Sequence, residues 1–314
     1  MSRSRILLTG AAGFVGSHLT RRLLADGNAV GVILRPGSDL WRISELTSKL
    51  RVFWADLDDL SSVRRDLADF APEHAVDLAW CGVQNPHRND VEQTQNLRTG
   101  VELLQSLKAA GCRNFVGFGS HAEYGPCLYP ISEDTPTAPT TIYGLAKLCS
   151  YFRAREFCAS NDLRFVWLRL FSSYGPYEDP SWLIPSVTLA LLKGDRPALT
   201  FGEQKWDFIH VRDVVDAVAC VLRNTEARGS FNLGSGDAPP LRSTIEYLRD
   251  LIDPSLSLGF GEVTYRSDQV MLLQANVSRL CRETDWRPRV SLFEGLRETV
   301  AWYRDGHDRR LADA

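Results

Sequence analysis

Short apolar segments alternate with longer amphipathic segments through the first 170 residues of the chain. The apolar segments are rich in branched aliphatic side chains, which is typical of buried strands. Strands are predicted at residues 6–9, 29–34, 51–55, 76–80, 115–118 and 164–170. The amphipathic segments repeat apolar residues every three or four positions, as a helix with one buried face does, and Phe14, Leu19, Leu23 and Leu24 are expected to face inward. Helices are predicted at residues 13–25, 60–70, 91–110 and 143–159.

This alternation predicts an α/β fold, because a helix after each strand can return the chain to the same end of a sheet. We expect a doubly wound parallel sheet with helices on both faces. The pattern changes after residue 170, where Pro and Gly at positions such as 175–176, 179–180, 194, 197 and 202 break the chain into short pieces. Beyond them, helices are predicted at residues 212–223 and 292–303, and a short strand at residues 231–233.

Composition and charge exclude several classes of protein. The 314 residues carry 36 basic and 39 acidic side chains, so no basic surplus points to a nucleic-acid partner. No apolar run reaches the roughly 18 residues of a membrane helix, and the N-terminal apolar run is broken by glycines, unlike a signal peptide. The 7 cysteines form no C-x-x-C pair and no histidine cluster accompanies them, so we expect reduced thiols in a cytoplasmic protein and no metal site.

The segment that follows the first predicted strand has the spacing of a dinucleotide-binding turn. Gly10, Gly13 and Gly16 stand between that strand and a predicted helix, with Phe14 and Val15 at the helix start. Glycines there let the backbone approach a pyrophosphate held at the helix N-terminus. Residues 1–170 are therefore expected to form a Rossmann domain, with returns from about 205–235, and residues 171–314 mainly a smaller α/β substrate lobe. The ligand site should lie between them, at the carboxyl ends of the strands.

The residues after the second predicted strand bear on the choice of cofactor. A carboxylate at that place would accept the ribose 2′-hydroxyl of NAD, but the chain has Leu34 followed by Arg35. A guanidinium can bind a 2′-phosphate, so NADP(H) is favoured and NAD(H) is the alternative. Asp56 and Leu57, after the third predicted strand, are candidate adenine contacts.

Three residues suit proton transfer coupled to hydride transfer. Tyr143 and Lys147 lie four positions apart on one helix face, and Ser120 follows the fifth predicted strand. A phenol has an ordinary pKa near 10, which the lysine and a cationic nicotinamide are expected to lower. Tyr143 would exchange a proton with a substrate oxygen that Ser120 orients. Together with the glycine turn, this triplet indicates an oxidoreductase acting on a carbonyl or carbinol.

At this point nearly the whole chain resembles the extended short-chain dehydrogenases/reductases, the group that contains nucleotide-sugar epimerases, dehydratases and reductases. Beyond the glycines, Ser120 and Y-x-x-x-K, the matching blocks are residues 168–171, 174–176, 182–185, 206–213, 231–234 and 284–288. The resemblance implies a Rossmann domain, bound NAD(P), a nucleotide-sugar substrate and a homodimer built on two helices per subunit.

The resemblance also implies roles for individual residues. Cys81, in the loop after the fourth predicted strand, would face the nicotinamide. Arg266 would bind the diphosphate, whereas Trp206 stands where the family often has another arginine for that group. The sugar or base pocket would be lined by Gln84, His121, Ser172, Trp182 and Leu183.

Departures from the family pattern narrow the expected reaction. His121 and Ala122 stand where the 4,6-dehydratases carry an Asp-Glu pair, which argues against dehydration. The run around Glu123 looks more like the reductases that make CDP-abequose and CDP-paratose, with Glu123 itself expected to be structural and His210 a packing residue. We expect NADPH-dependent reduction of a nucleotide-linked 4-keto-6-deoxy sugar. The alternatives are a nucleotide-sugar 4-epimerase, a non-catalytic NADP-sensing regulator and a reductase of small non-sugar ketones.

Overall fold

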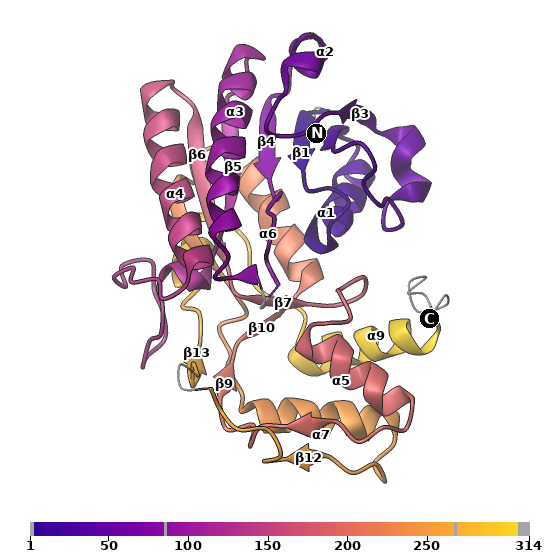
Figure 1. The fold of residues 1–314 in the computed structure, drawn as a ribbon. Helices are drawn as coiled ribbons and strands as arrows, with labels where there is room; N and C mark the ends of the chain where they lie inside the picture. Colours follow the sequence, from indigo (N-terminus) through magenta and orange to yellow (C-terminus); the bar gives the residue numbers. More distant parts are fainter. Residues whose placement is uncertain (1–2, 85–86, 267–268, 307–314) are drawn as a thin grey trace.

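Parallel strands form one central sheet (Figure 1). The structure is a computed structural model that describes residues 3–84, 87–266 and 269–306. The 7-stranded sheet has the order β11-β6-β5-β4-β1-β2-β3, and every neighbouring pair in it is parallel. Its strands are β1 (Arg5–Thr9), β2 (Ala29–Leu34), β3 (Arg51–Trp54), β4 (His74–Asp77), β5 (Asn114–Ser120), β6 (Arg164–Leu170) and β11 (Gly229–Leu233). The strand order reverses between β1 and β4, which is where ligands bind in such sheets.

Helices cover both faces of this sheet. One face carries α1 (Phe14–Ala25), α6 (Val211–Arg223) and α8 (Ser278–Glu283), whose side chains share an apolar core with the strands. The other face carries α2 (Arg64–Phe70), α3 (Gln95–Ala109) and α4 (Ile142–Ser160), around a second core. Single 3-10 turns are η1 (Ser44–Lys49), η2 (Ser61–Val63), η4 (Val91–Thr94) and η5 (His121–Glu123). The predicted α/β doubly wound fold is confirmed.

The chain beyond β6 builds most of a smaller lobe next to the sheet (Figure 1). Its helices α5 (Leu183–Leu192), α7 (Leu241–Ile252) and α9 (Leu292–Arg304) enclose a third apolar core. Its short parallel pairs are β7 (Ser172–Tyr174) with β10 (Phe208–His210), β8 (Ala198–Leu199) with β12 (Gly259–Phe260), and β9 (Lys205–Trp206) with β13 (Leu272–Leu273). From this part of the chain α6 and β11 return to the sheet. The predicted boundary between the two domains at residue 170 stays a prediction.

The strand predicted at residues 76–80 ends earlier than expected. β4 pairs with β1 only as far as Asp77, which lies opposite Thr9. There the Thr9 hydroxyl accepts the N–H groups of Leu78 at 3.2 Å and Ala79 at 3.1 Å, so a side chain replaces the strand ladder. Trp80 consequently lies in a loop, and its side chain does not have to follow the alternating directions of side chains along a strand.

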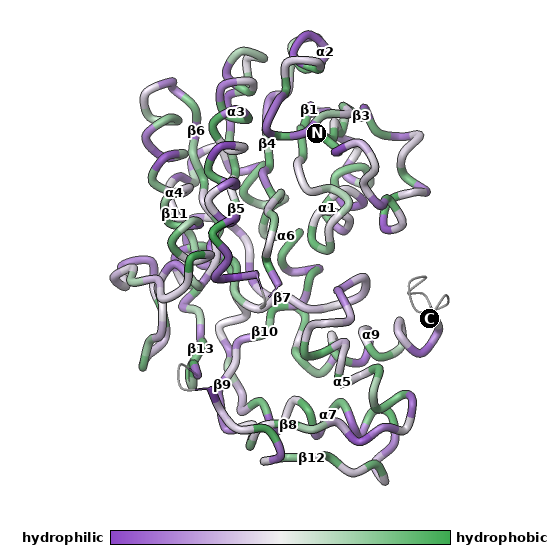
Figure 2. Tube along the Cα trace, viewed as in Figure 1, coloured by the Kyte–Doolittle hydropathy of each residue, from purple (hydrophilic) through white to green (hydrophobic). Residues whose placement is uncertain are grey.

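The hydropathy of the chain follows this layered arrangement. In Figure 2 hydrophobic residues run along the strands of the sheet, and hydrophilic residues gather on the outer helix turns and loops. Within the described residues, no helix combines the length and the apolar character that crossing a bilayer requires.

Candidate active site

The turn between β1 and α1 has the shape of a phosphate cradle. Gly10 has a φ of +67°, and a Cβ there would lie 2.8 Å from backbone atoms that follow β4. A Cβ on Gly16 would overlap the carbonyl oxygen of Gly10, so helix and turn pack without side chains between them. Gly13 is the N-cap of α1, and no side chain caps the helix. The first-turn amides, which include those of Phe14 and Val15, therefore have no intrahelical acceptor and favour an anion.

The residues predicted for the adenosine end lie at the same edge of the sheet. Arg35 is exposed directly after β2, where buried Leu34 takes the place of a ribose-binding carboxylate. Asp56 is exposed after β3, and one of its carboxylate oxygens accepts the N–H of Asp58 at 3.2 Å. Leu57 is half-buried and packs against the apolar core. Arg35 and Asp56 are thus both accessible to a ligand beside the glycine turn.

A second arginine near the glycine turn was not predicted. Arg42 places one guanidinium nitrogen 3.5 Å from the carbonyl oxygen of Ala12, inside the turn. Its Nε donates to the carbonyl oxygen of Tyr177 at 2.9 Å. Tyr177 follows β7 and has a φ of +70°, a left-handed conformation that is uncommon outside glycine. Arg42 therefore ties the turn to the smaller lobe, and no spacing in the sequence indicated this contact.

Ser120 is held in place by a buried acid. It ends β5, its hydroxyl accepts the N–H of Ala122 at 3.2 Å, and its own N–H donates to Glu123 at 3.0 Å. Glu123 has no exposed surface, and it also accepts from Trp167 Nε1 at 3.0 Å and from Arg169 Nε at 2.7 Å. Both carboxylate oxygens are therefore used within the protein. The expectation that Glu123 is structural agrees with this geometry.

Tyr143 and Lys147 come from the first turns of α4. Both are buried, at 7 % and 5 % exposure, and they lie one helical turn apart. The Ser120 side chain lies close enough to the Tyr143 phenol to lower its pKa against the effect of burial. Lys147 Nζ donates to the carbonyl oxygen of Phe118, also on β5, at 2.8 Å. The structure thus brings the three predicted catalytic residues together at the carboxyl end of β5.

The charges around Tyr143 differ from expectation. Lys147 Nζ lies 3.7 Å from the ring centroid of Trp80 and 6.0 Å from that of Tyr143. The guanidinium carbon of Arg88 is nearer to Tyr143, at 5.0 Å from the ring centroid. Burial raises the pKa of the Tyr143 phenol, and the opposing effects of Arg88 and Ser120 do not offset it. Lys147 is not among the groups that lower the pKa of Tyr143 in this structure, and the expected lowering by Lys147 together with a bound nicotinamide stays a prediction.

The loop after β4 forms a wall beside Tyr143. Trp80 meets the Tyr143 ring edge-on, with 6.0 Å between the ring centroids, and its Nε1 donates to Gln93 at 2.8 Å. Cys81 is exposed immediately after it, and Gln84 is half-buried further along the loop. Trp80 was not predicted as a site residue, because the pattern placed it inside a strand.

Three predicted substrate residues lie near β5 and β7. Trp206 Nε1 donates to the Ser172 hydroxyl at 2.7 Å, so these two residues meet. His121 follows Ser120 and packs against Phe171, with 5.8 Å between the ring centroids. Burial, and next the charge of Arg88, lower the pKa of His121 to about 3, so the imidazole is neutral at physiological pH.

Two guanidinium groups, those of Arg88 and Arg266, influence each other near Tyr143. The guanidinium carbon of Arg88 lies 5.8 Å from the ring centroid of Trp182, the N-cap residue of α5. Burial lowers the pKa of Arg88, and the charge of the exposed Arg266 adds to this effect. Paired cations of this kind favour an anionic ligand. Leu183, by contrast, packs against the apolar core of the smaller lobe.

A sequence model of the NAD dependent epimerase/dehydratase family matches residues 6–234. The matched stretch holds the glycine turn, Ser120, Tyr143 and Lys147. The chain belongs to this family. It is an enzyme of the extended short-chain dehydrogenase/reductase type, in the group that acts on nucleotide sugars.

Relatives of this family member carry out different reactions. UDP-glucose 4-epimerase of Corynebacterium glutamicum is 28% identical over 306 residues, covering 90% of this chain and 91% of that protein. dTDP-4-dehydro-6-deoxyglucose reductase of Escherichia coli is 25% identical over 315 residues, covering 95% and 97%. The solved structure of DesIV, a dTDP-glucose 4,6-dehydratase of Streptomyces venezuelae with NAD bound, is 27% identical, has a TM-score of 0.86 and covers 98% of each chain. The family therefore leaves the reaction open.

The residues of this chain fit a dinucleotide. The glycine turn leaves no space for a Cβ at Gly10 or Gly16, the α1 amides are uncapped, and the Ser120–Tyr143 pair lies at the same edge of the sheet. These features would hold a pyrophosphate at one end and place the nicotinamide beside Tyr143 at the other.

Proposed function

We propose that this enzyme reduces the 4-keto group of a nucleotide-linked 4-keto-6-deoxy sugar with NADPH. The observation that carries the proposal is the position of Tyr143, a buried phenol beside Ser120 whose pKa is raised by burial. A phenol that stays protonated near neutral pH is a proton donor, which is what reduction of a ketone requires.

The chain's own residues would act in a short sequence. NADPH, when bound, supplies the hydride. Ser120 would donate a hydrogen bond to the keto oxygen and hold it beside Tyr143, and Tyr143 would give its proton to that oxygen. Burial lowers the pKa of Lys147 to about 8, so this lysine is still mostly charged at pH 7 and can stabilise the phenolate that forms. Arg88 would do the same from the other side of the ring.

Preference for NADPH rests on the end of β2. Leu34 is buried and carries no carboxylate, while the exposed Arg35 offers a guanidinium to a 2′-phosphate. Arg42, beside Ala12, adds a second positive charge near the glycine turn. NAD(H) is the alternative cofactor.

A 4-epimerase is the second candidate, because the Corynebacterium glutamicum relative is named as one. Epimerisation would require Tyr143 to accept a proton before returning it, whereas reduction requires it only to give one. The missing carboxylate after β2 also fits poorly with a permanently held NAD.

The test combines turnover with a matched pair of variants. Purified enzyme is incubated with NADPH and several nucleotide-linked 4-keto-6-deoxyhexoses, and NADPH absorbance is followed. Tyr143→Phe should lose at least about 100-fold in kcat while binding NADPH normally, because only the proton donor is removed. Tyr129→Phe, at an exposed position, is the control and should match the parent. Redox-neutral conversion of a nucleotide hexose, without NADPH use, would establish the epimerase instead.

Exposed apolar side chains and free cysteines support proposals about the oligomeric state and the cellular compartment of the enzyme. We infer a homodimer formed through α3 and α4, because these helices expose Val101 at 39%, Leu145 at 52% and Phe152 at 44%. All seven cysteines are free, and Cys81 and Cys149 are exposed, which suits a reducing cytoplasm. No nucleic-acid or membrane partner is proposed.

A further inference from the structure

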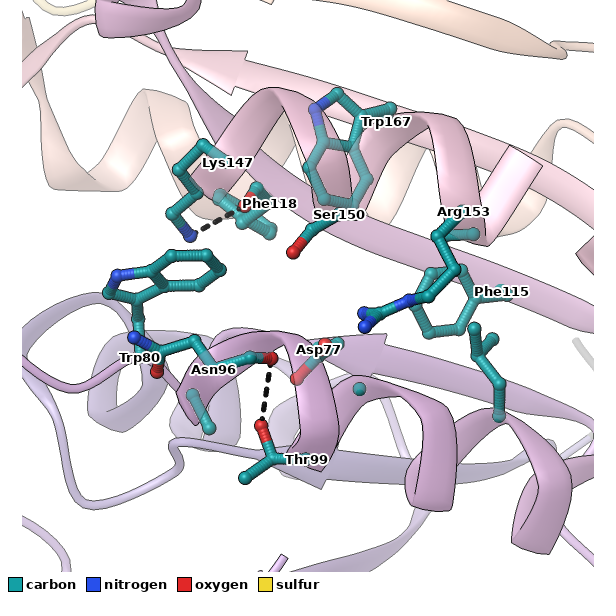
Figure 3. Close-up of a pocket in the computed structure, with 14 residues that line it drawn as sticks. Asp77, Trp80, Asn96, Thr99, Phe115, Phe118, Lys147, Ser150, Arg153 and Trp167 are labelled. Carbon is teal, nitrogen blue, oxygen red and sulfur yellow. Dashed lines mark hydrogen bonds between the residues drawn. The ribbon is translucent and has the colours of Figure 1, made fainter. Parts of the chain in front are cut away.

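A small pocket lies beside Lys147, between α3, α4 and the sheet (Figure 3). Its volume is about 20 Å³, enough for one water molecule. Its polar lining includes Asp77, Asn96, Lys147, Ser150 and Arg153. Lys147 therefore belongs both to the catalytic group and to the lining of this pocket.

Two polar atoms in this lining lack a partner. Among the described residues, neither Ser150 Oγ nor Arg153 Nε has a hydrogen-bond partner, and Ser150 is only 4% exposed. In Figure 3 the Ser150 hydroxyl points into the space. The guanidinium of Arg153 is anchored by a hydrogen bond from Nη1 to the carbonyl oxygen of Leu97. Leaving such groups unsatisfied is costly, so a bound water with several polar neighbours is favoured here.

The same cavity brings together the half-buried acid Asp77, the buried Lys147 and the half-buried Arg153. Asp77 ends β4, and one of its carboxylate oxygens accepts from the Thr9 hydroxyl at 2.5 Å. Figure 3 shows the Arg153 guanidinium directed toward Asp77, with Lys147 on the far side of the space. Asp77 is not needed for the proton transfer described above, yet a carboxylate in this position faces the rear of the catalytic lysine.

We propose that Asp77 is the counter-ion of Lys147 and acts on it across a water molecule that Ser150 and Arg153 help to hold. Asp77 is then a positioning residue, since it would touch neither substrate nor cofactor. Its effect would be to keep Lys147 charged in a buried place where a lone ammonium would lose its proton. The inference rests on the proposed function only in that Lys147 belongs to the catalytic group.

Besides Asp77, the ionisable groups near Lys147 are Glu123, Tyr143 and Arg153. Burial lowers the pKa of Lys147 to about 8, while Asp77 and then Glu123 oppose this effect. Glu123 is already paired with Arg169 at 2.7 Å, so its charge is balanced. On the lysine's own helix Tyr143 is neutral, and Arg153 competes with Lys147 for Asp77. Removing Asp77 should therefore lower the pKa of Lys147, and removing Arg153 should raise it.

The charge of Lys147 can be measured without substrate or cofactor. Lys147 Nζ lies 3.7 Å from the ring centroid of Trp80, so loss of its proton removes a cation–π contact and changes Trp80 fluorescence. The fluorescence difference between the protein and its Trp80→Phe variant is titrated with pH. The parent midpoint is expected near pH 8, the pKa of Lys147.

The variants give opposite shifts. Asp77→Asn, which retains an acceptor for Thr9, should move the midpoint down by about one pH unit, and Arg153→Gln should move it up. Ser150→Ala changes the same cavity without changing charge and should move it much less. The proposal is overturned if Asp77→Asn leaves the midpoint in place, or if Ser150→Ala moves it equally. If Asp77→Asn does not fold, the upward shift in Arg153→Gln decides. Because no turnover is needed, failure of the reductase assay leaves this result unaffected.

Discussion

The guanidinium carbon of Arg88 lies 5.0 Å from the centre of the Tyr143 ring, closer than the ammonium of Lys147 at 6.0 Å. The two residues are also joined through the backbone, where the N–H of Tyr143 donates to the carbonyl oxygen of Arg88 at 2.8 Å. The charge of Arg88 is the largest influence that lowers the pKa of Tyr143 against the effect of burial.

Replacing Arg88 should change how Tyr143 titrates. In Arg88→Gln the cation is lost, the neutral phenol is favoured, and the pKa of Tyr143 rises further. Oxidation of the alcohol product with NADP⁺ needs the phenolate, so its activity should rise only at a pH about one unit higher than in the parent. The measurement is kcat for the oxidative direction as a function of pH.

Arg88→Lys is the matched control for that experiment. It keeps the positive charge and should retain most of the parental pH profile. An unchanged profile in Arg88→Gln, or equal shifts in both variants, would show that the charge of Arg88 does not act on Tyr143.

The cofactor preference can be tested at the end of β2. Arg35→Asp should weaken NADPH binding by about 100-fold and NADH binding much less, because a carboxylate repels the 2′-phosphate and can accept the ribose hydroxyl. Dissociation constants for both cofactors are measured by titration calorimetry. Arg51→Asp makes the same charge change at the start of β3, at the amino end of the strands, whereas Arg35 lies at their carboxyl end. It should leave both dissociation constants unchanged. If Arg35→Asp weakens the binding of NADPH and NADH equally, Arg35 does not contact the 2′-phosphate.

The buried pair of Glu123 and Arg169 should dominate the stability of the site. The two side chains are 0% and 4% exposed, so Glu123→Gln leaves an unbalanced guanidinium in the interior. We expect a loss of about 3–5 kcal/mol in the free energy of unfolding, measured by urea denaturation. Glu123→Gln combined with Arg169→Met removes both charges and should recover part of this loss. If Glu123→Gln alone unfolds like the parent, the pair contributes little.

Much of the sheet could be predicted from local sequence because its strands are short apolar runs between turns. The bounds predicted for 29–34 and 164–170 are those of β2 and β6. The helices α5 and α7 were not predicted, because the chain after residue 170 was taken to be broken into short pieces by Pro and Gly. Pro185 lies in the first turn of α5, where its missing N–H removes no helix hydrogen bond, and Pro240 is the N-cap of α7. Proline therefore marked where these helices begin.

The candidate site divides in the same way. Ser120, Tyr143 and Lys147 could be found because their residue types and spacing form a known pattern. Arg88 and Asp77 could not, since their roles depend on loops and strands far apart in the chain meeting beside α4. The effect of burial on the pKa of Tyr143 was also not predicted, because the depth of burial depends on the whole tertiary fold.

The proposed homodimer makes a prediction about one helix face. Leu145 and Phe152 lie seven residues apart on α4, hence on the same face, and both are exposed in the single chain. Leu145→Glu should place a charge in the dimer contact and give a monomer, detected by sedimentation or light scattering, and Phe152→Glu should do the same. Leu128→Glu is the control, because Leu128 is 92% exposed on a loop outside α4 and should leave the assembly intact. A dimer that survives both α4 substitutions would have to use another surface.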